Sequence, residues 1–181
     1  MLPHYQFSQA SRGKEEPIYG NLFEITLIPP TGIDGSLLLE HVNTVSGIGG
    51  VNPGVDAVGQ KYKFADRSYA GMPGQTFIDV GVNFSLNLNE ANQAYTYKTL
   101  REWYKRIYNP ETGEMGLKKD YTGTMIIVQY DRTGRIFRKL TLKDVFLTGE
   151  FSMSDSLDYS SPDPIPIDVT FRCDWWEEEL S

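Results

Sequence analysis

The chain has 181 residues, a length that fits one domain with a sizeable single core. Hydrophobic residues make up 40% of it and aromatic residues 13%, which is the composition of a folded protein and not of a disordered one. The net charge of −7 argues against a protein that grips nucleic-acid phosphates, since such a grip needs clustered Lys and Arg; it suits an ordinary acidic protein or a surface that repels nucleic acid.

The chain is expected to open with an extended arm followed by two strands. Residues 1–20 are polar and mixed, without the charged-then-apolar pattern of a signal peptide, and we expect them to stay loose until a neighbour holds them. The alternating stretch 22–28 predicts a half-buried strand that ends at Pro29, and 36–45 predicts a second strand. A single domain is expected over 21–181, with no apolar run that reaches the roughly 20 residues needed for membrane insertion.

A glycine-rich region from about 45 to 74 predicts a projecting β-arm. Within it, 60–67 alternates with the period of a strand, whereas its flanks hold too many glycines to build a compact core. An exposed strand edge of this kind invites pairing with another chain. Deleting 51–72 is therefore expected to leave the subunit folded. The residues expected to make the assembly contact are Lys61, Tyr62, Lys63, Phe64, Arg67, Tyr69 and Met72.

A long strand and one helix are predicted in the middle of the chain. Over 76–88, apolar residues recur at period two from Val80 onward and the opposite face is small and polar, which predicts a strand buried on one side. A helix is predicted over 89–108, with Asn89 as its N-cap, and we expect it to pack across a sheet. Its apolar stripe consists of Tyr97, Leu100, Trp103, Tyr104 and Ile107.

The remainder of the chain is again rich in strand patterns. Strands are predicted over 124–130 and 135–142, joined by a four-residue turn, and another strand over 143–151. A last alternating strand is predicted over 167–176. One face of it is made of Ile167, Val169, Phe171, Cys173 and Trp175. The order of elements predicts a mainly β fold: an antiparallel β-sandwich or barrel with one flanking α-helix and a projecting β-arm.

No pattern in the sequence predicts catalysis, a metal site or a cofactor. The glycines of 49–54 have the spacing of a phosphate-binding loop, but the next two positions lack the lysine and the hydroxyl residue, so a hinge is favoured. The two histidines are far apart in sequence, and the single cysteine, Cys173, is interpreted as a small core residue. The acidic run 177–179 is interpreted as a solvated terminus, and the basic and aromatic stretch 61–64 as an assembly contact in preference to a phosphate contact.

Seven stretches carry a family resemblance through their order along the chain. They are 21–25, 59–67, the strand opening at 76–77, the helix that bears Trp103, 129–134, 144–150 and 169–176. Together they cover about residues 21 to 176 and resemble the tail tube proteins of contractile-tailed bacteriophages, which are related to the tube proteins of contractile injection systems. The chain departs from the family in the Pro- and Gly-containing loop after the first strand and in the glycine-rich base of the arm.

The resemblance implies a structural subunit and not an enzyme, with no cofactor. It implies homohexameric rings whose strands join into one inner barrel, and which stack into the tube of a contractile tail through which double-stranded DNA passes without specific binding. The arm would contact a neighbouring subunit or ring. Implied partners are the tail sheath, the baseplate tube-initiator and the tail terminator; the implied location is the virion tail, after assembly in the host cytoplasm. Candidates to face the lumen, by alternation alone, are Asn83, Ser85 and Asn87, and either face of their strand could point inward.

Three alternatives stay open at this point. The chain could be a tube or tube-initiator subunit of a contractile injection or secretion system. It could be a different interaction module of a virion or secretion machine. It could also be a ligand-binding barrel or an enzyme, which would need a pocket with convergent polar groups.

Overall fold

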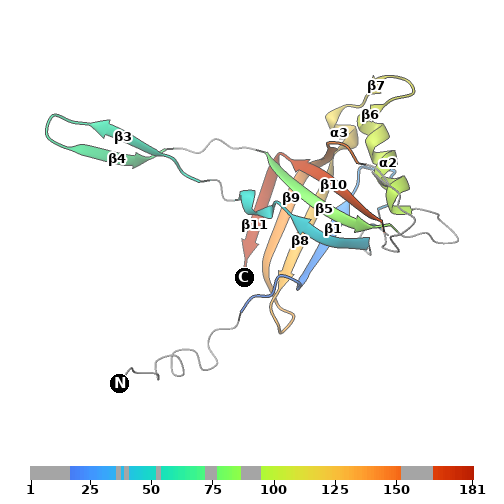
Figure 1. Ribbon diagram of the computed structural model, residues 1–181, viewed down its shortest axis with the longest axis horizontal. Helices are drawn as coiled ribbons and strands as arrows, with labels where there is room; N and C mark the ends of the chain where they lie inside the picture. The colour runs from blue at the N-terminus through green and yellow to red at the C-terminus, as the bar shows by residue number, and fades with distance from the viewer. Residues whose placement is uncertain are drawn as a thin grey trace, which may run out of the picture.

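The computed structural model describes residues 17–35, 38, 41–51, 54–71, 77–86, 95–151 and 165–181 (Figure 1). Its elements are mostly antiparallel strands, with one main helix, so the predicted fold class is confirmed. In chain order they are β1 (Phe23–Ile28), β2 (Val42–Ser46), η2 (Ile48–Val51), β3 (Ala57–Lys61), β4 (Asp66–Ala70), β5 (Ile78–Ser85), α2 (Tyr95–Ile107), β6 (Tyr108–Asn109), β7 (Glu114–Met115), α3 (Lys118–Tyr121), β8 (Gly123–Tyr130), β9 (Ile136–Thr148), β10 (Pro166–Cys173) and β11 (Trp175–Leu180).

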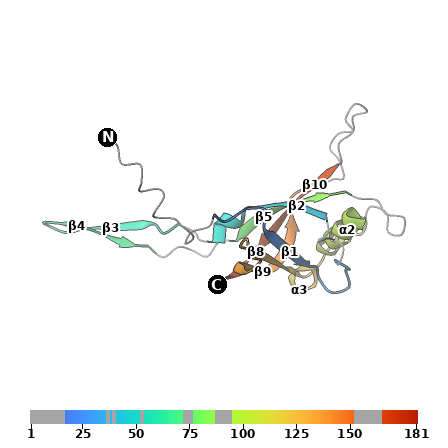
Figure 2. The same cartoon turned by 90° about the horizontal axis from the view of Figure 1, so that it is seen from below.

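In the described part of the chain, seven strands form one hydrogen-bonded sheet that folds over itself into two layers. The order is β1-β8-β9-β10-β5-β2, with β11 beside β9, and every pairing is antiparallel. Figure 2 shows β2, β5 and β10 in one layer and β1, β8 and β9 in the other. Apolar side chains from both layers and from α2 form a single core between them.

Strand β9 belongs to both layers because it bends once without breaking. Its first part pairs with β8 and β11, and its last residues pair with β10. At the bend, Asp144 has a φ of +55° and the pairing with β8 shifts register, which marks an extra residue of the kind found in β-bulges. The strands predicted over 135–142 and 143–151 are therefore one strand, and this part of the prediction is wrong.

A matching bend at Asp174 separates β10 from β11. Lys118 of the short helix α3 pairs with the Asp174 carboxylate, and Asp144 adds to the attraction; the pKa of Lys118 is raised mainly by the hydrogen bond to Asp174. The two bends thus lie near one ammonium group. At this bend the alternation of inward and outward side chains shifts by one residue. Trp175 is therefore 48% exposed, and Trp176 packs against the core in its place. The prediction that Trp175 shares the buried face of the last strand is wrong.

Strand periodicity predicted the buried faces of β5 and β10 correctly elsewhere. In β5, Val80, Val82 and Phe84 are buried, and in β10 the same holds for every second residue from Ile167 to Cys173. The second predicted strand is shorter than expected. It covers Val42–Ser46, whereas His41 lies in the turn before it, and 36–37 and 39–40 lie outside the described residues.

Helix α2 closes the core through the predicted stripe. Leu100 and Trp103 are completely buried, and Tyr97 and Ile107 pack against the core. The predicted start of the helix and its N-cap Asn89 lie outside the described residues. In the described residues, no helix is both long enough and apolar enough to cross a bilayer.

The base of the arm contributes to the core, which corrects the deletion predicted from the sequence. Val51 is only 5% exposed, and its carbonyl oxygen accepts a hydrogen bond from the Trp176 indole at 3.0 Å. Removing 51–72 would therefore open a cavity and leave the indole N–H without its partner. A deletion that begins after Val51 spares this contact.

Cys173 gives a direct test of how tightly the core is closed. It is a free, buried thiol, and burial raises its pKa to about 11. At pH 8 the native protein is expected to react with an aromatic disulfide reagent at least about 100-fold more slowly than the denatured chain, because the thiolate is the reactive form. Stopped-flow absorbance with and without denaturant measures the ratio. Complete labelling of the native protein within minutes would show that this face of β10 is open.

Candidate assembly surfaces

The predicted arm is a β-hairpin that projects from the sandwich on the side away from α2 (Figure 1). Its strands are β3 and β4, and every residue of both is exposed. The turn closes with a hydrogen bond from the Tyr62 N–H to the Ala65 carbonyl at 2.9 Å. The segment 60–67 is therefore not a single strand as predicted, because its alternation continues across a chain reversal.

The hairpin has two unlike faces, since side chains alternate along each strand. Larger side chains cluster on one face, where the Tyr62 hydroxyl donates to Gln60 Oε1 at 2.8 Å and lies 3.4 Å from the Tyr69 hydroxyl. The Arg67 guanidinium lies 6.0 Å from the Tyr62 ring centroid. The alternate positions carry the small residues Ala57, Gly59, Ser68 and Ala70, and next to the turn the oppositely charged pair Lys61 and Asp66. One face thus offers aromatic and cationic groups, and the other allows close approach of another backbone only along its small residues.

The tip of the hairpin is apolar and positively charged. Phe64 is 90% exposed, and Lys63 Nζ lies 5.5 Å from its ring centroid. Residues 54–71 carry three cations and two anions, a net charge of +1 in a chain of −7. An isolated two-stranded hairpin is marginally stable at best in water, so a covering surface would stabilise it. Six of the seven residues predicted for the assembly contact lie on this hairpin, Met72 lies outside the described residues, and the contact itself stays a prediction.

The outward face of the layer β2–β5–β10, here called the polar face, is a second candidate surface. It consists of Asn43, Thr44 and Ser46 of β2, Asp79, Gly81, Asn83 and Ser85 of β5, and Asp168, Thr170 and Arg172 of β10. Asn43 donates to Asn83 Oδ1 at 3.0 Å, and Asn83 donates to Asp168 Oδ1 at 2.7 Å. Asn83 and Ser85 are thus on this face, as their alternation predicts, whereas Asn87 lies outside the described residues.

One ion pair on the polar face joins two strands directly. Arg172 of β10 is paired with Asp79 of β5 in the strand register, and its Nε and Nη2 donate to the two carboxylate oxygens at 2.7 and 2.8 Å. The Phe77 ring lies 3.9 Å from the guanidinium carbon. The hydrogen bonds from Arg172 hold the pKa of the Asp79 carboxyl below its usual range, so this group stays ionised at neutral pH. No local sequence pattern predicts the pair, because its members are 93 residues apart and only the strand register shows that they meet.

Unpaired strand edges are a third feature that bears on assembly. In the described part of the chain, β1 and β2 end the hydrogen-bonded path, since β1 pairs only with β8 and β2 only with β5. Free N–H and C=O groups at such edges are templates for pairing with another chain.

The acidic run near the end of the chain is part of a strand and not a solvated terminus, which corrects the sequence interpretation. Three carboxylates of β11 each pair with a base of β9. The pairs are Arg138–Glu178 at 2.6 Å, Lys143–Glu177 at 2.6 Å and Lys139–Glu179 at 3.3 Å. Lys143 lowers the pKa of Glu177 through its hydrogen bond. Most of the charge in this run is therefore balanced within the subunit.

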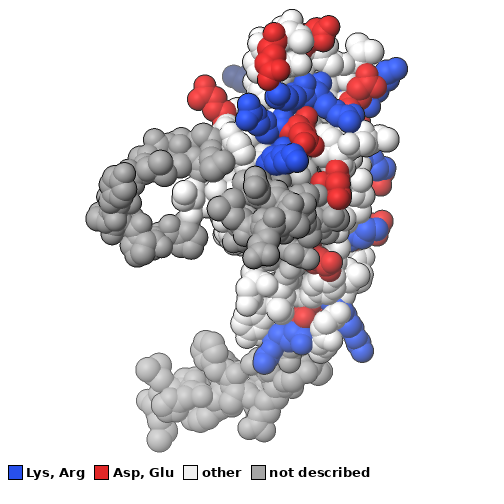
Figure 3. All heavy atoms as spheres, turned by 90° about the vertical axis from the view of Figure 1, so that its right-hand side faces the viewer, with Lys and Arg blue, Asp and Glu red and all other residues white. Residues whose placement is uncertain are grey.

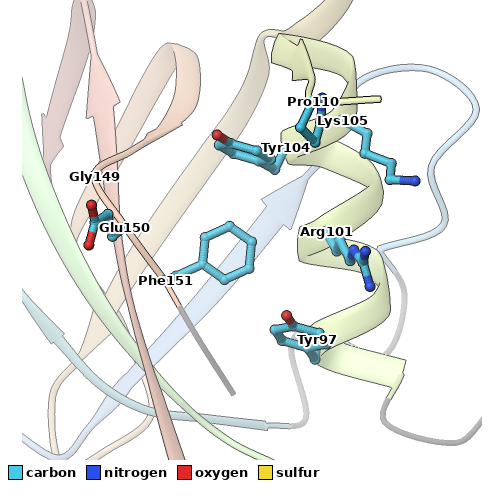
Figure 4. Close-up of a pocket in the computed structure, with 8 residues that line it drawn as sticks. All are labelled: Tyr97, Arg101, Tyr104, Lys105, Pro110, Gly149, Glu150 and Phe151. Atoms are coloured by element: carbon cyan, nitrogen blue, oxygen red, sulfur yellow. The ribbon is translucent and has the colours of Figure 1, made fainter. Parts of the chain in front are cut away.

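A groove of about 380 Å³ lies between α2 and the segment that follows β9 (Figure 4). The Phe151 ring meets Tyr97 and Tyr104 edge to face, with centroids 6.1 and 6.0 Å away. Lys105 on the rim is paired with Glu111 at 2.8 Å. Figure 3 looks onto this end of the molecule and shows Lys and Arg close to Asp and Glu, not a patch of one sign. The groove thus presents aromatic surface with mixed charges.

The described residues contain no group of three or more His, Cys, Asp and Glu side chains placed to hold a metal ion. No family model matches the sequence, and no curated protein matches it either. Solved structures do match.

The tube-terminating cap of the anti-feeding prophage aligns with a TM-score of 0.61 at 13% identity, over 97% of this chain and 99% of that chain. A chain of the PVC sheath/tube terminator, from an extracellular contractile injection system in its extended state, gives a TM-score of 0.59 at 14% identity, over 92% and 99%. A chain of the PVC sheath–tube complex gives 0.58 at 15%, over 92% and 94%. At these identities the likeness establishes the fold, which agrees with the tail tube resemblance of the sequence.

Proposed function

We propose that this chain is a structural subunit of the inner tube of a contractile apparatus, which assembles into hexameric rings that stack into a conduit. The observation that carries the proposal is an exposed hairpin, without a core of its own, on a domain whose fold matches tube-system components over nearly its whole length. The hairpin is proposed to contact a second copy, because its net charge is opposite to that of the remaining chain.

The open edges of the sheet support closure into a ring. The two ends of the strand path, β1 and β2, each have one side without a partner strand among the described residues. A head-to-tail contact between unlike surfaces closes into a ring when the rotation per subunit closes, and otherwise extends into a filament. Ring formation through strand edges and stacking through the hairpin would use separate surfaces of one subunit.

The conduit is proposed to carry DNA, as in a phage tail, with the polar face as its wall. The described residues of that face carry two carboxylates and one guanidinium, so each subunit would present a wall of small polar groups with a slight negative charge. Such a wall repels a polyanion and does not retard it. Sheath, baseplate and terminator proteins are the proposed partners, and the assembled tail is the proposed location.

The second candidate is a tube, tube-initiator or terminator subunit of an extracellular injection system. One observation favours it, since the solved structures named above belong to such systems. The two candidates share the assembly and differ in cargo.

Electron microscopy of the purified chain tests the proposal. Rings or tubes of uniform bore, with sixfold class averages, are the expected result. A monodisperse monomer at high concentration, confirmed by light scattering, would contradict the tube. Isolated rings that never stack would point to a terminator or initiator.

A further inference from the structure

Arg172 is the only cation on the described residues of the polar face, and the Nε/Nη2 edge of its guanidinium is already occupied. Nε and Nη2 form a fork with Asp79 at 2.7 and 2.8 Å, and the Phe77 ring lies 3.9 Å from the guanidinium carbon. The fork matters because a guanidinium binds phosphate with the same two-pronged geometry that it uses for a carboxylate. Asp79 therefore occupies the Nε/Nη2 edge of the guanidinium, where a phosphate would otherwise form the same fork.

The pair is accessible and so lies where a passing ligand would meet it. The Arg172 side chain is 34% exposed and that of Asp79 is 42% exposed. The remaining ionisable group of the face, Asp168, accepts a hydrogen bond from Asn83 at 2.7 Å and has no cation beside it in the described structure. The two carboxylates of the face thus differ in one respect: only Asp79 covers a cation.

We infer that Asp79 is a specificity-determining residue of the polar face, which blocks the guanidinium of Arg172 and thereby prevents the face from binding phosphate groups. The inference rests on the proposed function for its biological meaning, because a wall that must let a polyanion pass has to keep such a cation covered. Its physical content concerns the subunit alone and is testable without assembly.

Arg172 also has a structural reason to be present, which explains why the cation is covered and not simply absent. It faces Asp79 directly across the β5–β10 pairing, where opposite charges stabilise adjacent strands. A neutral residue at position 172 would lose this contact between the strands. An arginine without Asp79 would instead offer one phosphate-binding group in every copy around a ring. Each phosphate contact adds about 0.9 to the slope of log affinity against log salt, so even one per subunit is measurable.

The test compares Asp79→Asn with Asp168→Asn in the full-length protein, kept unassembled at low concentration. Both changes raise the net charge by one on the same face, but only the first uncovers Arg172. Binding to a fluorescently labelled 20-base-pair duplex is followed by anisotropy at several salt concentrations. Asp79→Asn is expected to bind about fivefold more tightly than the natural chain, with a salt slope larger by about 0.9, and Asp168→Asn is expected to stay within about twofold.

Two further variants keep the result interpretable. The double change Asp79→Asn with Arg172→Gln is expected to abolish the gain, and Asp79→Ser repeats the uncovering with a shorter side chain if the amide disturbs the fold. Circular dichroism melts show that each variant is folded. Equal gains for Asp79→Asn and Asp168→Asn, or a gain that persists without Arg172, would overturn the inference, because net charge alone would then explain the binding.

The outcome is separable from that of the proposed function. If the natural chain forms no rings or tubes and Asp79→Asn still gains binding, the blocking role stands and the conduit is wrong. If tubes form and Asp79→Asn binds no better than the natural chain, the conduit stands and the blocking role is wrong.

Discussion

Replacing residues 56–71 by a short Gly-Ser linker is expected to leave the sandwich folded and to abolish the proposed stacking of rings into tubes. The hairpin can be removed because all its strand residues are exposed and its base is closed by one hydrogen bond, from the Gly71 N–H to the Asp56 carbonyl at 2.6 Å. The replacement spares Val51, which belongs to the core. Losing exposed residues changes the stability by about 0.5 kcal/mol, or about 2 °C in Tm.

The measurement combines a thermal melt with electron microscopy of the same sample. A matched pair of point variants locates the effect: Phe64→Ala removes the 90% exposed ring at the tip, and Met115→Ala removes a 75% exposed side chain from β7 near α2. Phe64→Ala is expected to reduce tube length or yield, and Met115→Ala to leave both unchanged. Normal tubes from the chain without its hairpin would contradict the assigned role, and an unfolded product would show that the core extends into the arm.

Trp103→Ala is expected to cost about 3–5 kcal/mol of unfolding free energy, the largest effect of any single change proposed for this chain. The side chain is completely buried, its ring centroid lies 5.6 Å from that of Phe171, and its N–H donates to the Tyr121 carbonyl at 2.7 Å. Truncation leaves a cavity and removes the donor from the part-buried hydrogen bond to the Tyr121 carbonyl. Because a domain is stable by about 5–15 kcal/mol in total, Tm should fall by on the order of 10 °C, or the chain should fail to fold.

Trp175→Ala is the matched control, since it removes the same side chain from a position that is 48% exposed. Its expected cost is below about 1 kcal/mol. Chemical denaturation followed by far-ultraviolet circular dichroism measures both variants. Equal losses at the two positions would contradict the bend at Asp174, because an unbent strand would bury Trp175 in the core as fully as helix α2 buries Trp103.

The contrast between these tryptophans shows what the sequence could predict. Period-two alternation correctly predicted that Val80, Val82 and Phe84 are buried, because successive side chains of a strand point to opposite faces and only one face of this strand is covered. The helical stripe placed Trp103 for the same reason at a period of 3.6. These are local patterns, and each is readable within about a dozen residues.

Two of the failures, at Asp144 and at Asp174, have the same physical cause. At Asp144 and Asp174 the strands absorb a residue, so the alternation changes phase while the hydrogen-bonded ladder continues. At Asp144 the shifted alternation resembles the end of one strand and the start of another, so two strands were predicted where there is one. After Asp174 the same shift moves Trp175 from the predicted buried face to the exposed face. At the arm the opposite happened, because the alternation of 60–67 runs across a turn.

The candidate surfaces were predictable only in part. Exposure of the arm follows from its glycines, and the small polar face of β5 follows from alternation. The contact between Asp79 and Arg172 depends on the register between β5 and β10, which no local pattern specifies.

The two bends have a mechanical consequence. Strand β9 runs through Asp144, and the neighbouring chain runs through Asp174, so two adjacent backbones cross the corner between the layers side by side. The main chain of β9 and the chain from β10 to β11 each continue from one layer into the other. The two layers are therefore joined by covalent bonds as well as by hydrogen bonds between strands. A force that pulls the layers apart would therefore load both backbones at the corner together, which couples the two layers of the subunit mechanically.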